Sequence, residues 1–138
     1  MDPKPLTTLA RETFADDRYA TSLTGIAIEH VGDHTAECSL AVASHHLNAR
    51  DVVMGGVLFT MADFAAAIAA NTDSLSAGKP LAWVSLDATI HYLAPSTGAT
   101  LKAISGAMKH GRTTALYHTD LYCDDRRVAV VETTMMHV

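Results

Sequence analysis

The segment from Met54 to Asn71, MGGVLFTMADFAAAIAAN, constrains the fold more than any other part of the chain. It consists of small and apolar residues and carries one charge, Asp63, near its middle. This composition predicts a helix that is apolar on all sides, and a folded protein must enclose such a helix. A curved antiparallel sheet is a structure that can surround it.

A membrane span is the alternative interpretation, because the apolar run from Val52 to Ala70 is long enough to raise it. The Gly55-Gly56 pair and the central Asp63 argue against a span, since a carboxylate at the centre of a bilayer costs about 2.5–3.5 kcal/mol. The rest of the chain has the strand patterns of a globular protein. We therefore expect no membrane span.

Strand patterns flank the helix on both sides. The pattern becomes that of strands from residue 25 to residue 42, where two strands are expected. Residues 35–42 alternate between polar and apolar, which is the period of a half-buried strand, and Gly32-Asp33 marks a turn before them. Turn residues separate four further expected strands, which cover residues 81–93, 99–109, 113–123 and 127–137. A short amphipathic helix is expected over residues 7–17, within an N-terminal helical segment of residues 1–20, and residues 71–80 are expected to be a loop. The order predicts an α+β domain over residues 1–138, with one sheet around one helix.

Composition narrows the function classes. Apolar residues make up 49% of the chain and charged residues 18%, which is typical of a globular domain. The net charge is -5 and the basic residues are scattered, so we expect no nucleic-acid partner. Two cysteines, Cys38 and Cys123, are too few for a disulfide framework, and the first residues contain no apolar signal segment. A cytoplasmic location is the expectation.

The carboxylate of Asp63 lies on the small-residue side of the predicted helix. At 100° per residue, Asp63 shares its side with Phe59, Ala66, Ala67 and Ala70, while Leu58, Met61, Ala65 and Ile68 lie opposite. The second set is the expected core face, and the alanines leave room for a ligand or another backbone. Asp63 is either a structural carboxylate bonded to a neighbouring loop or a functional one in a cleft.

The start of the helix adds a second candidate. Gly55 and Gly56 place free N–H groups at the helix N-terminus, where they can stabilise developing negative charge. Gly55 and Asp63 are eight positions apart, or about 12 Å along one helix. A base and an oxyanion donor must both lie about 3 Å from one reacting group, so one chain cannot easily supply both. Two antiparallel helices related by a two-fold axis could, which predicts an isologous dimer if this is an active site.

At this point the sequence resembles a known family. HLNARDVVMGGVLFTMADFAAAIAAN is similar to the signature of hotdog-fold acyl-CoA thioesterases of the PaaI-like branch, in which an Asn and a His-Gly-Gly precede a helix with an Asp or Glu. WVSLDATIHYLAPSTGATLKA and GRTTALYHTDLYCDDRRVAVVETTMM resemble the strands that follow. The resemblance covers residues 25–138. It implies an α+β hotdog fold, hydrolysis of an acyl-CoA thioester, no cofactor beyond the coenzyme A of the substrate, and homodimers or homotetramers.

The resemblance also implies roles for individual residues. Asp63 matches the catalytic carboxylate, as general base or nucleophile, and the Gly55 N–H matches the donor that polarises the thioester carbonyl. Asn48 matches an asparagine that positions the water or the carbonyl, and Ser85 matches a polar residue that assists the carboxylate. Met54 departs from the family, because it replaces the histidine of His-Gly-Gly. The backbone donor of Gly55 does not depend on that side chain.

Several further residues are candidates for substrate contact, although some of them have an ordinary structural role as the alternative. Met54, Gly56 and Ala67 are expected to line the substrate site, and His46 lies close to the motif, although a solvent-exposed turn is the commoner setting for His45 and His46. Lys109 and Arg112, with Arg126 and Arg127, lie at expected strand ends and could hold the phosphates of coenzyme A or be ordinary turn charges. Trp83 and Tyr92 are expected on opposite faces of one strand.

No metal site is expected from the spacing of possible ligands. His30 and His34 lie across a turn with no cysteine or carboxylate at ligand spacing. Cys38 is expected in the core and not as a nucleophile. Two rival functions stay open: a hotdog protein that binds an acyl thioester without cleaving it, favoured by Met54, and an acyl dehydratase or enoyl-CoA hydratase, which the absence of a histidine in the helix counts against.

Overall fold

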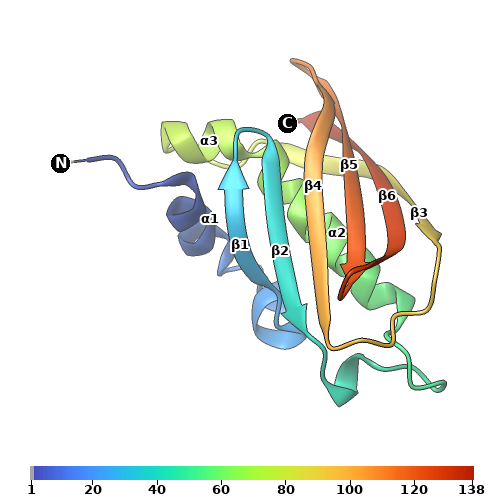
Figure 1. Ribbon diagram of the computed structural model, residues 1–138. Helices are drawn as coiled ribbons and strands as arrows, with labels where there is room; N and C mark the ends of the chain where they lie inside the picture. Colours follow the sequence, from blue (N-terminus) through green and yellow to red (C-terminus); the bar gives the residue numbers. More distant parts are fainter. Residues whose placement is uncertain (1) are drawn as a thin grey trace.

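A computed structural model describes residues 2–138. One six-stranded antiparallel sheet, in the order β1-β2-β4-β5-β6-β3, curves around the long helix α2 (Gly55–Ala70), as Figure 1 shows. The strands are β1 (Ala27–Gly32), β2 (Thr35–Ala41), β3 (Trp83–Tyr92), β4 (Thr100–His110), β5 (Thr114–Cys123) and β6 (Arg126–His137). The other helices are α1 (Leu6–Phe14), the π-helix η1 (Tyr19–Thr24), the 3-10 helix η2 (Ser44–His46) and α3 (Thr72–Ala77).

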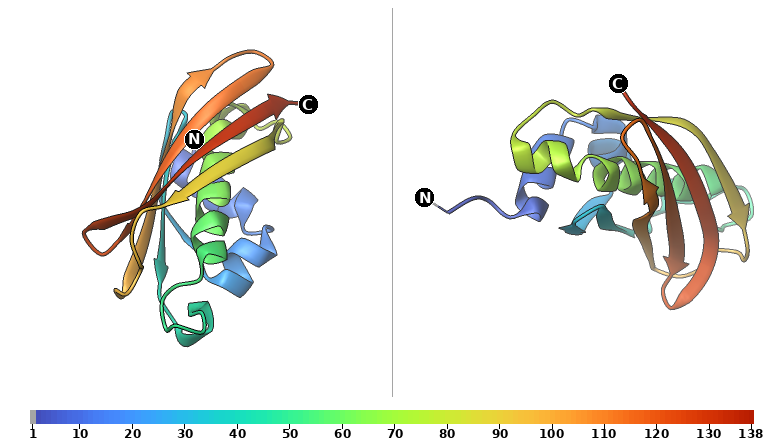
Figure 2. Two further views of the ribbon diagram at one scale, coloured as in Figure 1. Left: turned by 90° about the vertical axis from the view of Figure 1, so that its right-hand side faces the viewer. Right: turned by 90° about the horizontal axis from the view of Figure 1, so that it is seen from above.

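The helix α2 occupies the centre of the core. The sheet lies on one side of α2 and the N-terminal helices lie on the other, as the two turned views show (Figure 2). The expected core face is confirmed, because Leu58, Met61, Ala65 and Ile68 are all buried. Each large apolar side chain buried in this way contributes about 1.5–3 kcal/mol. No helix of the described residues is long and apolar enough to cross a membrane.

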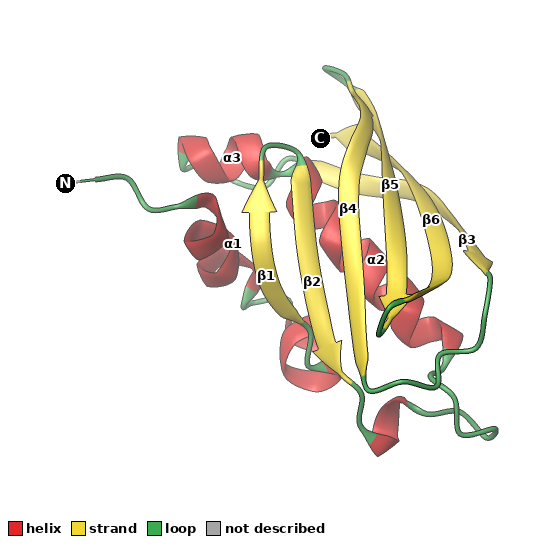
Figure 3. Ribbon diagram, viewed as in Figure 1, coloured by secondary structure: helices red, strands yellow, loops and turns green. Residues whose placement is uncertain are grey.

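The expected strands agree with the structure within a few residues (Figure 3). Strand β2 buries Ala36, Cys38 and Leu40 on one face, as the alternation predicts. The expected loop over residues 71–80 is wrong, because residues 72–77 form the helix α3. Asp73 stands in its first turn, and Gly78 ends it in the left-handed conformation at φ 64°, with its N–H donating to the carbonyl of Leu75.

A β-bulge in strand β3 changes which of its residues face the helix. The register with β6 shifts between Ser85 and Asp87. Trp83 and Ser85 face inward before the bulge, and Tyr92 faces inward after it, because the extra residue moves the inward positions from odd to even numbers. The expectation that Trp83 and Tyr92 lie on opposite faces is therefore wrong.

Candidate active site

Asp63 is exposed on the flank of α2, in a small pocket of about 250 Å³ between α2 and η1. The Oγ of Ser85 donates a hydrogen bond to Asp63 Oδ1 at 3.3 Å. Ala67 lines the same pocket, one turn along the helix. The structure therefore brings together three of the predicted site residues, Asp63, Ser85 and Ala67.

Asn71 fixes the strand that carries Ser85. This asparagine is 2% exposed, and its Oδ1 accepts hydrogen bonds from the N–H groups of Ala82 and Trp83 at 2.9 and 3.1 Å. Its Nδ2 donates to the carbonyl of Ala67 at 2.8 Å. The end of α2 is thereby tied to the beginning of β3, which sets Ser85 opposite Asp63. Because the oxygen and the nitrogen of this buried amide are both hydrogen-bonded, moving β3 away from α2 would leave a buried polar group unpaired, and this cost holds the strand in place.

A second pocket, of about 660 Å³, lies at the N-terminus of α2. Gly55, Tyr92, Arg50 and Ser96 are among the residues that line it. A Cβ at Gly55 would lie 2.8 Å from the ring of Tyr92, so glycine is what allows this close approach. The N–H groups of Gly55 and Gly56 belong to the first helical turn, whose donors have no carbonyl partner within the helix.

The loop before α2 is shaped by Asn48. Its Oδ1 accepts hydrogen bonds from the N–H groups of Arg50 and Val52 at 2.8 and 3.4 Å, and its own N–H donates to the carbonyl of Val52 at 2.8 Å. Asp51 completes the turn with φ 59°, a conformation that aspartate adopts more readily than most residues. Met54 follows as the N-cap residue of α2, with an exposed side chain.

His46 occupies a different setting from the one expected. It is buried, its Nδ1 accepts a hydrogen bond from the N–H of Ala43 at 2.9 Å, and its Nε2 lies 2.7 Å from the carbonyl of Thr24, to which it donates. The solvent-exposed turn predicted for this residue is wrong. Both ring nitrogens are used within the chain, so His46 has no free polar atom for a substrate.

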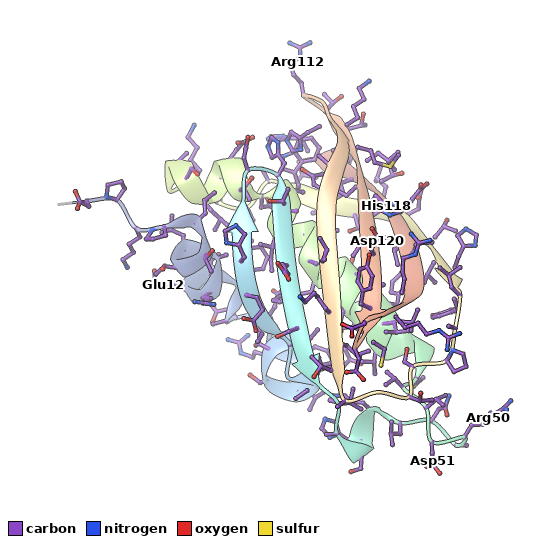
Figure 4. All side chains as sticks on the ribbon, in the orientation of Figure 1. Glu12, Arg50, Asp51, Arg112, His118 and Asp120 are labelled. Atoms are coloured by element: carbon purple, nitrogen blue, oxygen red, sulfur yellow. The ribbon has the colours of Figure 1, made fainter. Side chains whose placement is uncertain are left out.

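Two of the basic residues predicted for coenzyme A, Lys109 and Arg112, are far from Gly55 within one chain, whereas Arg126 lines a pocket that shares Pro95 with the Gly55 pocket. Lys109 and Arg112 are exposed at the β4–β5 hairpin. Arg112 lies at the top of the molecule and Arg50 at the bottom (Figure 4). Arg50 lines the Gly55 pocket and was not among the predicted residues. Its place in the sequence, two residues after Asn48 in the signature, is the signal that could have indicated it.

Asp17 is a second carboxylate at the Asp63 pocket and was not among the predicted site residues. Burial raises the pKa of the Asp17 carboxyl, and the charges of Asp63 and then Asp16 raise it further. Cys38 behaves as predicted for a core residue, because it is fully buried and burial raises the pKa of its thiol to about 12. A thiol with this pKa is not a nucleophile at neutral pH.

The raised pKa of Asp17 gives a pH-dependent stability prediction. A carboxyl whose pKa is higher in the folded state disfavours folding when ionised, and this cost is absent below the unfolded pKa of 3.8. We expect Asp17→Asn to raise the free energy of unfolding at pH 7 by about 0.5 kcal/mol or less, because Asp17 is largely exposed and screened. Urea denaturation of the wild type and of Asp17→Asn at pH 7 and at pH 3.5 measures this change in the free energy of unfolding. The gain should vanish at the lower pH. Asp125→Asn removes an exposed carboxylate in the β5–β6 turn, far from Asp17, and as the control it should change the free energy of unfolding little at either pH. An equal gain from Asp17→Asn at both pH values would contradict this cause.

Comparisons with known proteins place this geometry in a family. A family model described as the thioesterase superfamily matches residues 51–130. The acyl-coenzyme A thioesterase PaaI of Escherichia coli (strain K12) is 31% identical over 113 residues, which cover 81% of this chain and 76% of that protein.

Solved structures agree with this assignment. The structure of the Escherichia coli PaaI protein from the phenylacetic acid degradation operon superimposes with a TM-score of 0.79 at 26% identity, covering 96% of each chain. A hypothetical thioesterase protein of Streptococcus pneumoniae TIGR4, solved with coenzyme A, has a TM-score of 0.75 at 24% identity and covers 91% of this chain and 96% of that chain. This α+β chain, with one sheet curved around one helix, belongs to the thioesterase superfamily and to its PaaI-like branch of hotdog-fold thioester hydrolases.

Proposed function

We propose that the protein hydrolyses an acyl-CoA thioester, using Asp63 of one protomer and the Gly55 N–H of a second protomer. The observation that carries the proposal is the exposed carboxylate of Asp63 beside the Ser85 hydroxyl, on a helix whose N-terminus opens on a separate pocket. The activity of the similar Escherichia coli protein, named an acyl-coenzyme A thioesterase, supports the substrate class.

The reaction needs one proton acceptor and one oxyanion donor. Asp63 takes a proton from water as the water oxygen attacks the carbonyl carbon, and the Gly55 N–H donates to the oxygen that becomes negative. The C–S bond then breaks, coenzyme A leaves as the thiol with the proton that Asp63 held, and the acid is released. In the alternative, Asp63 attacks the carbonyl carbon, the C–S bond breaks and coenzyme A leaves as the thiolate, which gives a mixed anhydride; water then cleaves the anhydride to the free acid and restores the Asp63 carboxylate. Ser85 orients Asp63 in both cases.

Both protomers are needed because of the length of the helix. Eight residues of α2 separate Gly55 from Asp63, which corresponds to about 12 Å. Strand β3 is an edge of the sheet and carries exposed apolar side chains, including Val84 and Leu86. An unpaired apolar edge favours pairing with another strand. A homodimer joined along β3 would extend the sheet and bring the two copies of α2 together.

The pocket at Gly55 offers further groups for the substrate. Ser96 is 2% exposed, lines this pocket, and its Oγ has no hydrogen-bond partner among the described residues. A buried hydroxyl without a partner costs free energy that a polar atom of the substrate would recover. Arg50 at the same pocket supplies a cation for the phosphates of coenzyme A. Coenzyme A enters as part of the substrate, and none of these steps requires a metal ion.

Release of free thiol from a panel of aliphatic and aromatic acyl-CoA thioesters tests the proposal. Turnover is the expected result, and the substrate with the highest kcat/KM would identify the acyl class. The rival function is binding without cleavage. Met54 favours it, because this residue is 58% exposed at the helix N-terminus and its thioether cannot donate a proton. Tight binding of the panel with no thiol release from any member would contradict hydrolysis and support the rival.

A further inference from the structure

Three side chains that are distant in the sequence meet at the far end of the molecule from Gly55. His34 lies in the β1–β2 turn, Asp73 in the first turn of α3, and His110 at the end of β4. One ligand atom from each lies within 4.8 Å of the other two. The spacing of His30 and His34 predicted no zinc site, but the folded chain supplies His34 with two different neighbours.

The separations suit a small divalent ion. The Nε2 of His34 lies 3.0 Å from Asp73 Oδ2, and the Nε2 of His110 lies 3.8 Å from the same oxygen. Ligand bonds of about 2.0–2.1 Å in a tetrahedral zinc site place neighbouring donor atoms about 3.3 Å apart. The two observed separations lie on either side of that value, so the distances from each imidazole to the carboxylate are already close to those of a zinc site.

The imidazole of His110 has neighbours on the side away from Asp73, and these fix its orientation as the neighbours of a metal-bound histidine usually do. His110 Nδ1 is 2.7 Å from the hydroxyl of Tyr117, which leaves Nε2 to face Asp73. The ring of Trp83 packs against His110 with centroids 4.5 Å apart. A second partner on the remaining nitrogen fixes the tautomer and the ring orientation of a metal-bound histidine.

His34 is the ligand that must move. Its ring stacks on that of His110, with centroids 3.9 Å apart and planes inclined by 17°. Bonds to a metal lie in the plane of an imidazole, so two parallel rings cannot both point at one ion. The backbone of His34 is fixed, because its N–H donates to Thr72 Oγ1 and its carbonyl accepts from Ala107. Its side chain is 24% exposed, so rotation about Cβ–Cγ can open the stack towards solvent.

We propose that His34, Asp73 and His110 bind one Zn²⁺ ion per chain, with water in the fourth position, and that the ion ties α3 and the β1–β2 turn to β4. Two imidazoles and one carboxylate favour a borderline transition ion over Mg²⁺ or Ca²⁺, which take oxygen ligands. Helix α2 lies between this site and Gly55 and is about 24 Å long. The ion is structural, and the proposal does not rest on thioester hydrolysis.

Zinc binding to tag-free, chelator-treated protein tests the site. Calorimetric titration with Zn²⁺ should give one site per chain, and Co²⁺ in its place should give the visible absorption of a tetrahedral ion. We expect His34→Asn and Asp73→Asn each to weaken binding by about tenfold or more, since even partners outside the ligand set contribute that much. Asparagine is compatible with the φ of 51° at His34, so this change should preserve the turn.

His118 provides the matched control. It lies 3.1 Å from Asp120 and beside it on β5 (Figure 4), and Arg127 rather than a second histidine is the other neighbour of that carboxylate. His118→Asn should leave zinc affinity unchanged, and saturating Zn²⁺ should raise the Tm of the wild type and of this control but not of the two site variants. Failure of the wild type to bind one equivalent, or equal affinity in His34→Asn, Asp73→Asn and wild type, would overturn the proposal. Neither result bears on hydrolysis.

Discussion

Replacing Asp63 by Asn is expected to lower kcat/KM for acyl-CoA hydrolysis by about 10²–10⁴, the usual contribution of a general base. Asparagine keeps the size of the side chain and an oxygen that can accept from Ser85, so the pocket should be preserved. Only the ability to accept a proton or to attack a carbonyl is removed. Thiol release under single-turnover and steady-state conditions measures the effect.

Asp16→Asn is the matched control for the loss of a carboxylate. Asp16 is exposed, precedes the pocket-lining Asp17 and does not itself line the Asp63 pocket. It should therefore keep wild-type kcat/KM, and the Tm of both variants should show that they fold. Wild-type turnover in Asp63→Asn on every substrate of the panel would remove Asp63 from the reaction and return it to a structural role.

The central helix and its sheet could be predicted from the sequence because their signals are local and strong. The apolar segment that becomes α2 has no other stable setting in a globular chain, and the alternation in residues 35–42 reads directly as one buried and one open face. The resemblance over the helix signature and over the strand that follows it then marked Asp63, Gly55 and Ser85 as candidate site residues. The structure brings Ser85 to Asp63 through the tie that Asn71 makes to β3.

The features that could not be predicted depend on contacts between distant segments. The bulge after Ser85 adds one residue to β3 and turns Tyr92 towards Gly55, and a strict alternation cannot show it. Helix α3 is too short for its periodicity to outweigh its turn-forming residues. His46 looks polar in sequence, yet two backbone groups satisfy both ring nitrogens. Ligand spacing along the chain likewise could not reveal a cluster assembled from three elements.

Replacing Gly55 by Pro should lower kcat by about 10²–10³ relative to Gly55→Ala, because only proline removes the N–H that would stabilise the oxyanion. Both variants place a Cβ about 2.8 Å from the ring of Tyr92. That ring is exposed and can move aside. Proline is tolerated in the first helical turn, and the φ of -61° and ψ of 137° at Met54 suit a residue before proline.

Kinetics and thermal unfolding of the two variants distinguish the effect of losing the Gly55 N–H from the effect of the added Cβ against Tyr92. Similar Tm values with a much lower kcat in Gly55→Pro would assign the loss to the N–H. Equal losses in both variants would assign it to the contact with Tyr92 and contradict a role for Gly55 as donor.

Mixing the two inactive variants tests whether the site is shared between protomers. A heterodimer of Asp63→Asn with Gly55→Pro has one site in which both residues are changed and one in which both are native, provided that Gly55 and Asp63 come from different chains. Random pairing should then restore about one quarter of wild-type activity after co-refolding. If Gly55 and Asp63 of the same chain acted together, every site in the mixture would carry one defect and no activity would return. Restoration therefore requires the two-fold arrangement that the length of α2 implies.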